Sequence, residues 1–135
     1  MPCPFFEPRS VASEPRDAHS RVPLLDEYEG VCHAKGEPFR APDEFRSFCN
    51  HGYSREKCVH FPSEDSRSCV RFDIVGTSRG ELQLLCLEEH DYTPLRWQVV
   101  RCLIGSKTIE PELNDLCMRA QVLAFCRSYW RRFTD

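Results

Sequence analysis

Hydrophobic and polar side chains alternate along the second half of the chain, from about residue 70. Val70, Phe72 and Ile74 are separated by charged residues, a pattern typical of a strand with one buried face. Two further apolar segments follow, each preceded by turn-forming residues: 81–90 and 95–104. Short turns between successive strands predict a three-stranded antiparallel meander.

Helical spacing replaces this alternation near the end of the chain. Pro111 suits the first turn of a helix, and the acidic residues near it and the arginines at the far end match the helix dipole. The apolar stripe of this segment contains Leu113, Leu116, Cys117, Ala120, Leu123 and Ala124. We therefore predict a helix over residues 111–132 that lies across the sheet.

The first half of the chain has few residues that could form a core. Residues 1–66 contain only six Val and Leu residues, whereas residues 67–135 contain 17 Val, Ile and Leu residues. All but two of the ten prolines also lie in the first half, which predicts loops with a short helix from Pro42 to about Cys49.

Together these patterns predict an α+β fold class. We expect a loop-rich N-terminal half, bearing cysteine ligands, to pack on a three-stranded antiparallel sheet covered by one C-terminal helix. The loop-rich metal- or cluster-binding part is residues 1–66, and the meander with its helix is residues 67–135. At 135 residues the two parts are expected to form one compact domain.

The chain carries nine cysteines and a net charge of -3. Acidic and basic residues are interleaved, which argues against a nucleic-acid partner, and no apolar run approaches the roughly 20 residues of a membrane-spanning helix. Because the N-terminus also lacks the pattern of a signal peptide, we expect a cytoplasmic protein with no membrane partner. In that reducing compartment, cysteines are expected to be thiols or metal ligands and not disulfides.

The cysteines divide into two sets by their surroundings. Those in apolar segments are predicted to be buried core thiols: Cys86, Cys102, Cys117 and Cys126. Cys69, at the start of the first strand, could be either a core residue or a ligand. The loop-rich half contains the second set: Cys3, Cys32, Cys49 and Cys58. Since metal binding supplies folding energy that this half lacks, we predict that these four thiolates share one metal site.

The spacing of the second set favours a 4Fe-4S cluster over zinc. Structural zinc sites usually contain two cysteines separated by two to four residues. Here 28, 16 and 8 residues separate successive cysteines. A cubane of iron and sulfide is larger than one ion, so its thiolates stand further apart and can come from scattered loops. The predicted cofactor is a 4Fe-4S cluster, with Zn²⁺ as the alternative.

Three histidines lie within two residues of these cysteines: His33, His51 and His60. The Cys-x-His pairs at 49–51 and 58–60 superficially match those of Rieske centres, but Rieske proteins separate the pairs further and use a longer gap in the second pair. We expect the histidines to be exposed or to donate hydrogen bonds around the site. His60 is an alternative zinc ligand in place of Cys3.

The cysteine segments occur in a recognisable order: CPFF at residues 3–6, GVCHA at 30–34, FCNHGYSREKC at 48–58 and then FP. This order resembles a group of small bacterial proteins that share these cysteines ahead of a short sheet-and-helix region. The resemblance covers most of the chain and carries no activity with it. It implies that one set of cysteines belongs together: Cys3, Cys32, Cys49 and Cys58.

The sequence contains neither a phosphate-binding Gly-rich loop nor a nucleophile elbow, so we predict no enzyme. The predicted function is that of a small iron-sulfur protein in electron transfer or redox sensing, acting through an unidentified protein partner. The alternative is a zinc-stabilised protein-interaction module, with Trp130 and its aromatic and Arg neighbours as candidate anchors. A thiol enzyme using Cys32 or Cys58 would need a base and an orienting group that sequence adjacency does not supply.

Overall fold

The computed structural model describes residues 2–12, 24–40, 46–51, 58–62, 67, 69–103 and 105–133. The strands are β1 (Phe6–Val11), β2 (Tyr28–Cys32), β3 (Phe39–Arg40), β4 (Cys69–Ser78), β5 (Glu81–His90), β6 (Thr93–Leu103) and β7 (Thr108–Glu110). The helices are α1 (Arg46–His51) and α2 (Leu116–Phe133). The strands form two antiparallel sheets, with the orders β1-β2-β3 and β4-β5-β6-β7.

The N-terminal sheet corrects the predicted fold class. β1 pairs with β2, with Phe6 opposite Cys32, and β2 pairs with β3, with Cys32 opposite Phe39. Its core-facing side chains are few but large, since Phe6 and Tyr28 are almost completely buried. Few aliphatic residues occupy the other positions of these strands, so a count of aliphatic residues does not detect them. The prediction of a loop-rich N-terminal half is wrong for this reason.

The second sheet has four strands, where the hydrophobic pattern predicts three. β4, β5 and β6 form the predicted meander, and β7 extends it at the edge beside β6, with Ile109 opposite Cys102. β7 has only three residues, too few for an alternating pattern to be recognised. The predicted single three-stranded sheet under one helix is therefore wrong, because two sheets make up most of the fold.

The helix α2 begins at Leu116 and not at Pro111. The Oδ1 atom of Asp115 accepts a hydrogen bond from the backbone N–H of Met118 at 3.0 Å, which is the geometry of an N-cap residue. This side chain satisfies a donor at the helix end and so determines where the helix starts. The predicted start of α1 at Pro42 lies outside the described residues, and α1 ends at His51.

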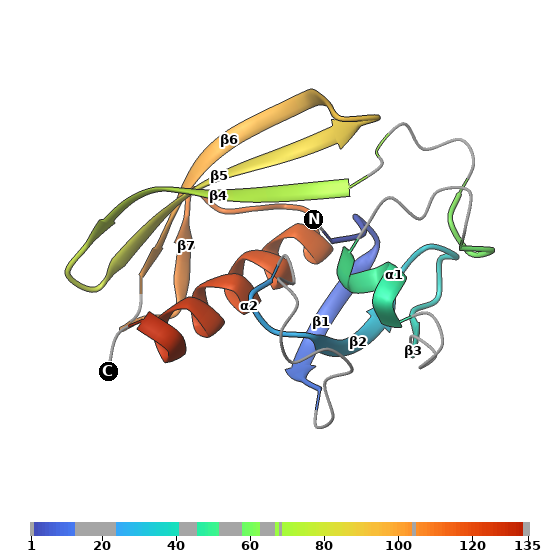
Figure 1. The fold of residues 1–135 in the computed structure, drawn as a ribbon, viewed down its shortest axis with the longest axis horizontal. Coiled ribbons are helices and arrows are strands. Elements are labelled where there is room, and N and C mark those ends of the chain that lie inside the picture. Colours follow the sequence, from blue (N-terminus) through green and yellow to red (C-terminus); the bar gives the residue numbers. More distant parts are fainter. Residues whose placement is uncertain are drawn as a thin grey trace.

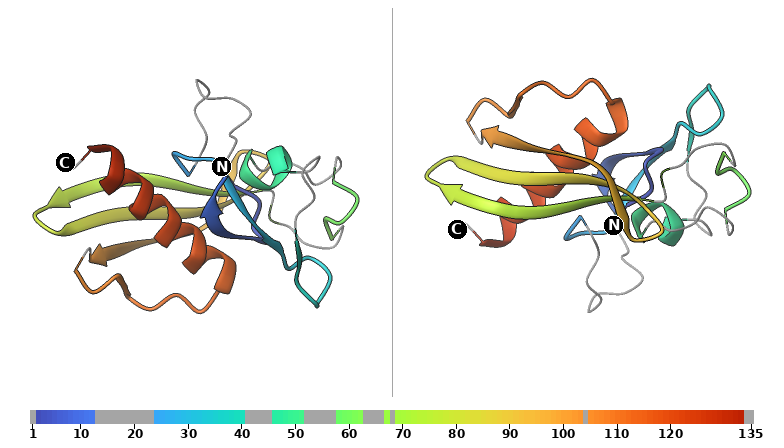
Figure 2. Two further views of the ribbon diagram at one scale, coloured as in Figure 1. Left: turned by 90° about the horizontal axis from the view of Figure 1, so that it is seen from below. Right: turned by 90° about the horizontal axis from the view of Figure 1, so that it is seen from above.

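α2 lies between the two sheets, as Figures 1 and 2 show. On one side, the ring of Phe125 contacts that of Phe72 on β4, with 5.9 Å between the centroids. On the other side, the hydroxyl of Tyr28 on β2 donates to the carbonyl of Ala124 at 2.9 Å and lies 2.6 Å from Ser128 Oγ. The helix is thus buried on two faces, and not only along the one predicted stripe. No described helix is long and apolar enough to cross a membrane.

Replacing Tyr28 with phenylalanine is expected to lower the free energy of unfolding by about 1–2 kcal/mol, because the carbonyl of Ala124 and the hydroxyl of Ser128 lose a partner inside the protein. Urea denaturation followed by circular dichroism measures the change. The matched control is Tyr92→Phe, which makes the same chemical change at a residue that is 74% exposed. Equal stability of the two variants would show that the Tyr28 hydroxyl adds nothing to the contact between β2 and α2.

Candidate metal centre

The four predicted ligands line one cavity, although they come from separate parts of the fold. Cys3 precedes β1, Cys32 ends β2, Cys49 lies in α1 and Cys58 belongs to the segment 58–62. The remaining lining residues are mostly aromatic: Phe5, Phe6, Ala34, Phe48, His60 and Phe61. The cavity has a volume of about 20 Å³, roughly the room that one water molecule needs.

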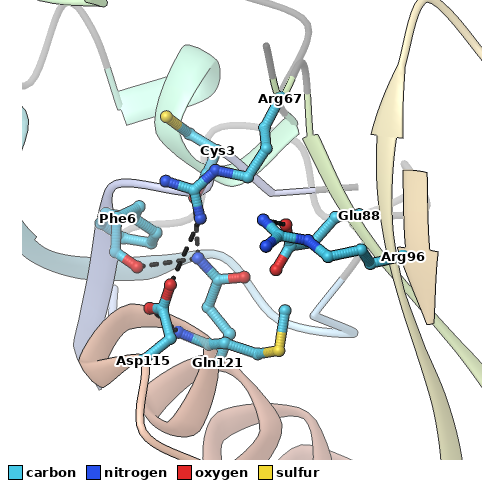
Figure 3. Close-up of polar contacts among 8 residues, drawn as sticks. Cys3, Phe6, Arg67, Glu88, Arg96, Asp115 and Gln121 are labelled. Atoms are coloured by element: carbon cyan, nitrogen blue, oxygen red, sulfur yellow. Dashed lines mark hydrogen bonds and ion pairs between the residues drawn. The ribbon is translucent and has the colours of Figure 1, made fainter. Parts of the chain in front are cut away.

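Backbone hydrogen bonds hold Cys3 and Cys49 near each other. The N–H of Cys3 donates to the carbonyl of Cys49 at 3.0 Å, which joins the N-terminal segment to α1. The carbonyl of Cys3 accepts from the N–H of Phe6 at 3.1 Å, so the chain turns just before β1. In Figure 3 the sulfur of Cys3 points away from Gln121 and toward α1.

Gln121 on α2 supports this turn from the other side. Its Nε2 atom donates to the carbonyl of Cys3 at 2.7 Å and to that of Phe6 at 2.8 Å (Figure 3). The side chain is fully buried, so both carbonyls are satisfied away from water. A polar residue of the helix interior therefore positions the segment that carries Cys3.

Asn50 attaches α1 to the N-terminal sheet. Its Oδ1 atom accepts from the backbone N–H of Tyr28 at 2.9 Å, and its Nδ2 atom donates to the carbonyl of Tyr28 at 3.0 Å. The side chain is completely buried. Because Asn50 follows Cys49 directly, this pair of bonds also fixes the position of Cys49 relative to β2.

Aromatic contacts shape the part of the cavity near Cys58. The N–H of Phe61 donates to the carbonyl of Cys58 at 3.2 Å, which closes a tight turn. The ring of Phe61 packs edge-to-face against Phe5, with 5.4 Å between the centroids. Cys58 and Cys32 are partly exposed, whereas Cys3 and Cys49 are buried. The cavity is thus deeper at the Cys3 and Cys49 side.

The neighbouring thiols contribute to the raised pKa of Cys49, which distinguishes it from an ordinary core thiol. The pKa of Cys49 is raised to about 12, chiefly by burial and additionally by Cys3, Cys32 and Cys58 in their thiolate forms. The pKa of Cys32 is also raised, chiefly by burial and also by Cys58, against a lowering hydrogen bond from the backbone of Ala34. The pKa of Cys86 reaches about 12 through burial alone. The pKa of Cys49 therefore depends on the charge of the other three thiols, whereas the pKa of Cys86 does not.

Four cysteines that line one cavity are not necessarily close enough together to bind one ion. Among the described residues, no three His, Cys, Asp or Glu side chains are arranged as ligands of a single metal ion. Sulfur atoms bound to one zinc ion lie about 2.3 Å from it, and hence only about 3.8 Å from one another. The four thiols therefore face a common space without the close convergence that one zinc ion requires.

The three neighbouring histidines have different surroundings. The Nε2 atom of His33 lies 2.7 Å from Oε1 of Glu7, at the edge of β1. His51 is exposed at the end of α1. His60 lines the cavity, and its ring contacts Phe39 with 4.9 Å between the centroids. His60 is thus the histidine whose position suits contact with a bound group.

The cysteines predicted to be core thiols are buried, which confirms that prediction: Cys86, Cys102, Cys117 and Cys126. Cys69 is also completely buried, at the start of β4, and is not among the residues that line the cavity. Cys117 has an additional feature that helical spacing did not indicate. Burial, and after it Asp115, Glu7 and the thiolates of Cys3 and Cys32, raise its pKa to about 12.

These features define a class of protein: a small two-sheet fold with a central helix, in which four cysteines from the N-terminal half line one aromatic cavity. Comparison of the chain with protein families, with curated proteins and with solved structures gives no match. The proposals below therefore depend on the residues of this chain alone.

Proposed function

We propose that Cys3, Cys32, Cys49 and Cys58 hold a 4Fe-4S cluster and that the protein acts in electron transfer or redox sensing. One observation carries the proposal: four cysteines distant in sequence line the same cavity. Soft thiolate ligands favour iron-sulfur clusters and zinc over hard cations such as Mg²⁺. The donor set therefore fits the cluster.

The surroundings suit an electron carrier. A bound cluster supplies one-electron transfer, and its reduction potential depends on burial and on hydrogen bonds near the sulfurs. Phe5, Phe48 and Phe61 would keep water from the centre, while the partly exposed Cys32 and Cys58 would leave one side near the surface. That side is where a protein partner could exchange electrons with the centre, since transfer requires close approach.

The second candidate is a zinc-stabilised protein-interaction module. The same four thiolates would hold one Zn²⁺, and the role of the metal would be to stabilise the fold. The spacing of the four cysteines along the chain favours the cluster, because no two of them are separated by the two to four residues that usually mark a zinc site. The cavity volume of about 20 Å³ is smaller than a cubane, so the lining side chains would have to move outward when it binds.

Anaerobic reconstitution with ferrous iron and sulfide tests the proposal. We expect about four iron and about four sulfide ions per chain, with visible charge-transfer absorption that bleaches on one-electron reduction. Protein alkylated at its cysteines before reconstitution is the control, because iron sulfide that adheres non-specifically would still be retained. A colourless protein that binds one zinc ion tightly and takes up no iron would overturn the cluster and support the interaction module.

A further inference from the structure

A separate cavity of about 270 Å³ lies along the C-terminal half of α2. Its walls come from the end of β6, from the turn between β6 and β7, and from the helix. The described lining residues are Cys102, Lys107, Leu123, Cys126, Arg127 and Trp130. None of them lines the four-cysteine cavity of the candidate metal centre. Packing of the second sheet against α2 therefore forms this cavity, and a bound cluster is not needed to shape it.

Four of the six lining residues make the interior of the cavity apolar. Cys102 and Cys126 are buried, and a buried free cysteine behaves as a small hydrophobic residue. Leu123 and Trp130 are only partly buried, so each has apolar surface that a bound molecule would remove from water. The interior therefore favours a ligand with an apolar body.

The other two lining residues are cations, and both are exposed: Lys107 and Arg127. Within the part of the chain that the structure describes, neither forms an ion pair with a carboxylate. Nearby arginines differ in this respect, because Arg101 on β6 pairs with two glutamates and Arg131 on α2 pairs with Asp26. Two cations beside one apolar cavity, with no acidic partner of their own, favour an anionic group on the ligand.

We propose that this cavity binds a small monocarboxylate with an apolar body, of the medium-chain fatty acid type. The carboxylate contacts Lys107 and Arg127, whose guanidinium group matches a carboxylate in shape and charge. The apolar body lies against Leu123 and Trp130. Since one water molecule occupies about 30 Å³ of the liquid, a cavity of 270 Å³ has room for about ten non-hydrogen atoms, the size of octanoate.

Calorimetric titration of the full-length protein with octanoate tests the proposal. Octanol and acetate are the matched probes, because octanol has the same chain without the carboxylate and acetate has the carboxylate without the chain. We expect octanoate to bind once per chain, and the other two to bind at least about tenfold more weakly. Octanoate that does not saturate the protein, or octanol that binds as tightly as octanoate, would overturn the proposal.

Tryptophan fluorescence tests where octanoate binds. The chain has two tryptophans, so Trp97→Phe leaves Trp130 as the only one, and Trp97 is 67% exposed, which makes this change mild. We expect the emission of Trp130 to change on titration and to saturate at the same octanoate concentration as the calorimetric signal. Calorimetric binding with no change in Trp130 emission would place octanoate elsewhere and overturn the assignment to this cavity.

Charge-removing variants test the role of the two cations. Arg127→Gln and Lys107→Gln are each expected to weaken octanoate binding by about fivefold or more, since each removes one charged contact with the carboxylate. Arg119→Gln is the control, because it makes the same change in charge at an exposed position of α2 that does not line the cavity. Far-UV circular dichroism verifies that each variant is folded. Equal weakening in all three variants would show that net charge, and not this site, attracts octanoate.

Discussion

Cys49→Ser is expected to lower the iron bound after anaerobic reconstitution by about tenfold or more, since a thiolate ligand at the deep side of the cavity is lost. Serine keeps the size of the side chain but offers a hydroxyl that does not bind iron as a thiolate does. Iron and sulfide analysis per chain measures the effect, and the visible absorption should fall in the same proportion.

Cys86→Ser is the matched control for this variant. Cys86 is buried to a similar extent and its pKa is raised to the same value of about 12, but it lies in the four-stranded sheet and does not line the four-cysteine cavity. We expect it to keep its full iron content. Equal losses in the two variants would mean that general destabilisation, and not ligand removal, accounts for the result at Cys49.

Gln121→Leu is expected to lower the free energy of unfolding by about 2 kcal/mol. The carbonyl of Phe6 loses a donor in a buried position, and the carbonyl of Cys3 keeps only the N–H of Phe6 as its donor. A buried polar group that loses its partner costs about 1–3 kcal/mol. Part of this cost is offset, because the Oε1 atom of Gln121 is buried and has no hydrogen-bond partner among the described residues, and leucine removes it. Urea denaturation of the metal-free protein measures the difference.

Gln98→Leu is the control for Gln121→Leu, because it makes the same chemical change at an exposed position of β6. Its unfolding midpoint is expected to remain close to that of the unmodified protein. If Gln121→Leu is as stable as this control, the two hydrogen bonds make no net contribution to stability. The turn that carries Cys3 would then depend on other contacts.

The second half of the fold could largely be predicted because its patterns are local. β4 and β5 show alternation or apolar runs over ten residues each, bounded by turn residues, and these suffice to place a strand. β7 and the strands of the N-terminal sheet are short and contain few aliphatic residues. These strands are stabilised by backbone pairing and by large buried side chains such as Tyr28. An alternating hydrophobic pattern does not detect either contribution.

The four cysteines could be singled out from the sequence, but the buried polar residues that hold their segments could not. Cysteines in segments without an apolar pattern stand out in the sequence, and all four line one cavity. Gln121 and Asn50, which hold the Cys3 and Cys49 segments, are polar residues that a sequence reading assigns to the surface. Only their hydrogen-bond partners make their burial favourable.

The sequence alone determined the meander, the C-terminal helix and the two kinds of cysteine environment, because each follows from side chains close together in the chain. The tertiary structure decided that α2 is enclosed between two sheets and that four cysteines distant in sequence line one cavity. It also brought the Tyr28 hydroxyl to the carbonyl of Ala124, 96 residues away. Such contacts depend on how distant segments pack, and a buried polar group is stable only where that packing supplies its partner.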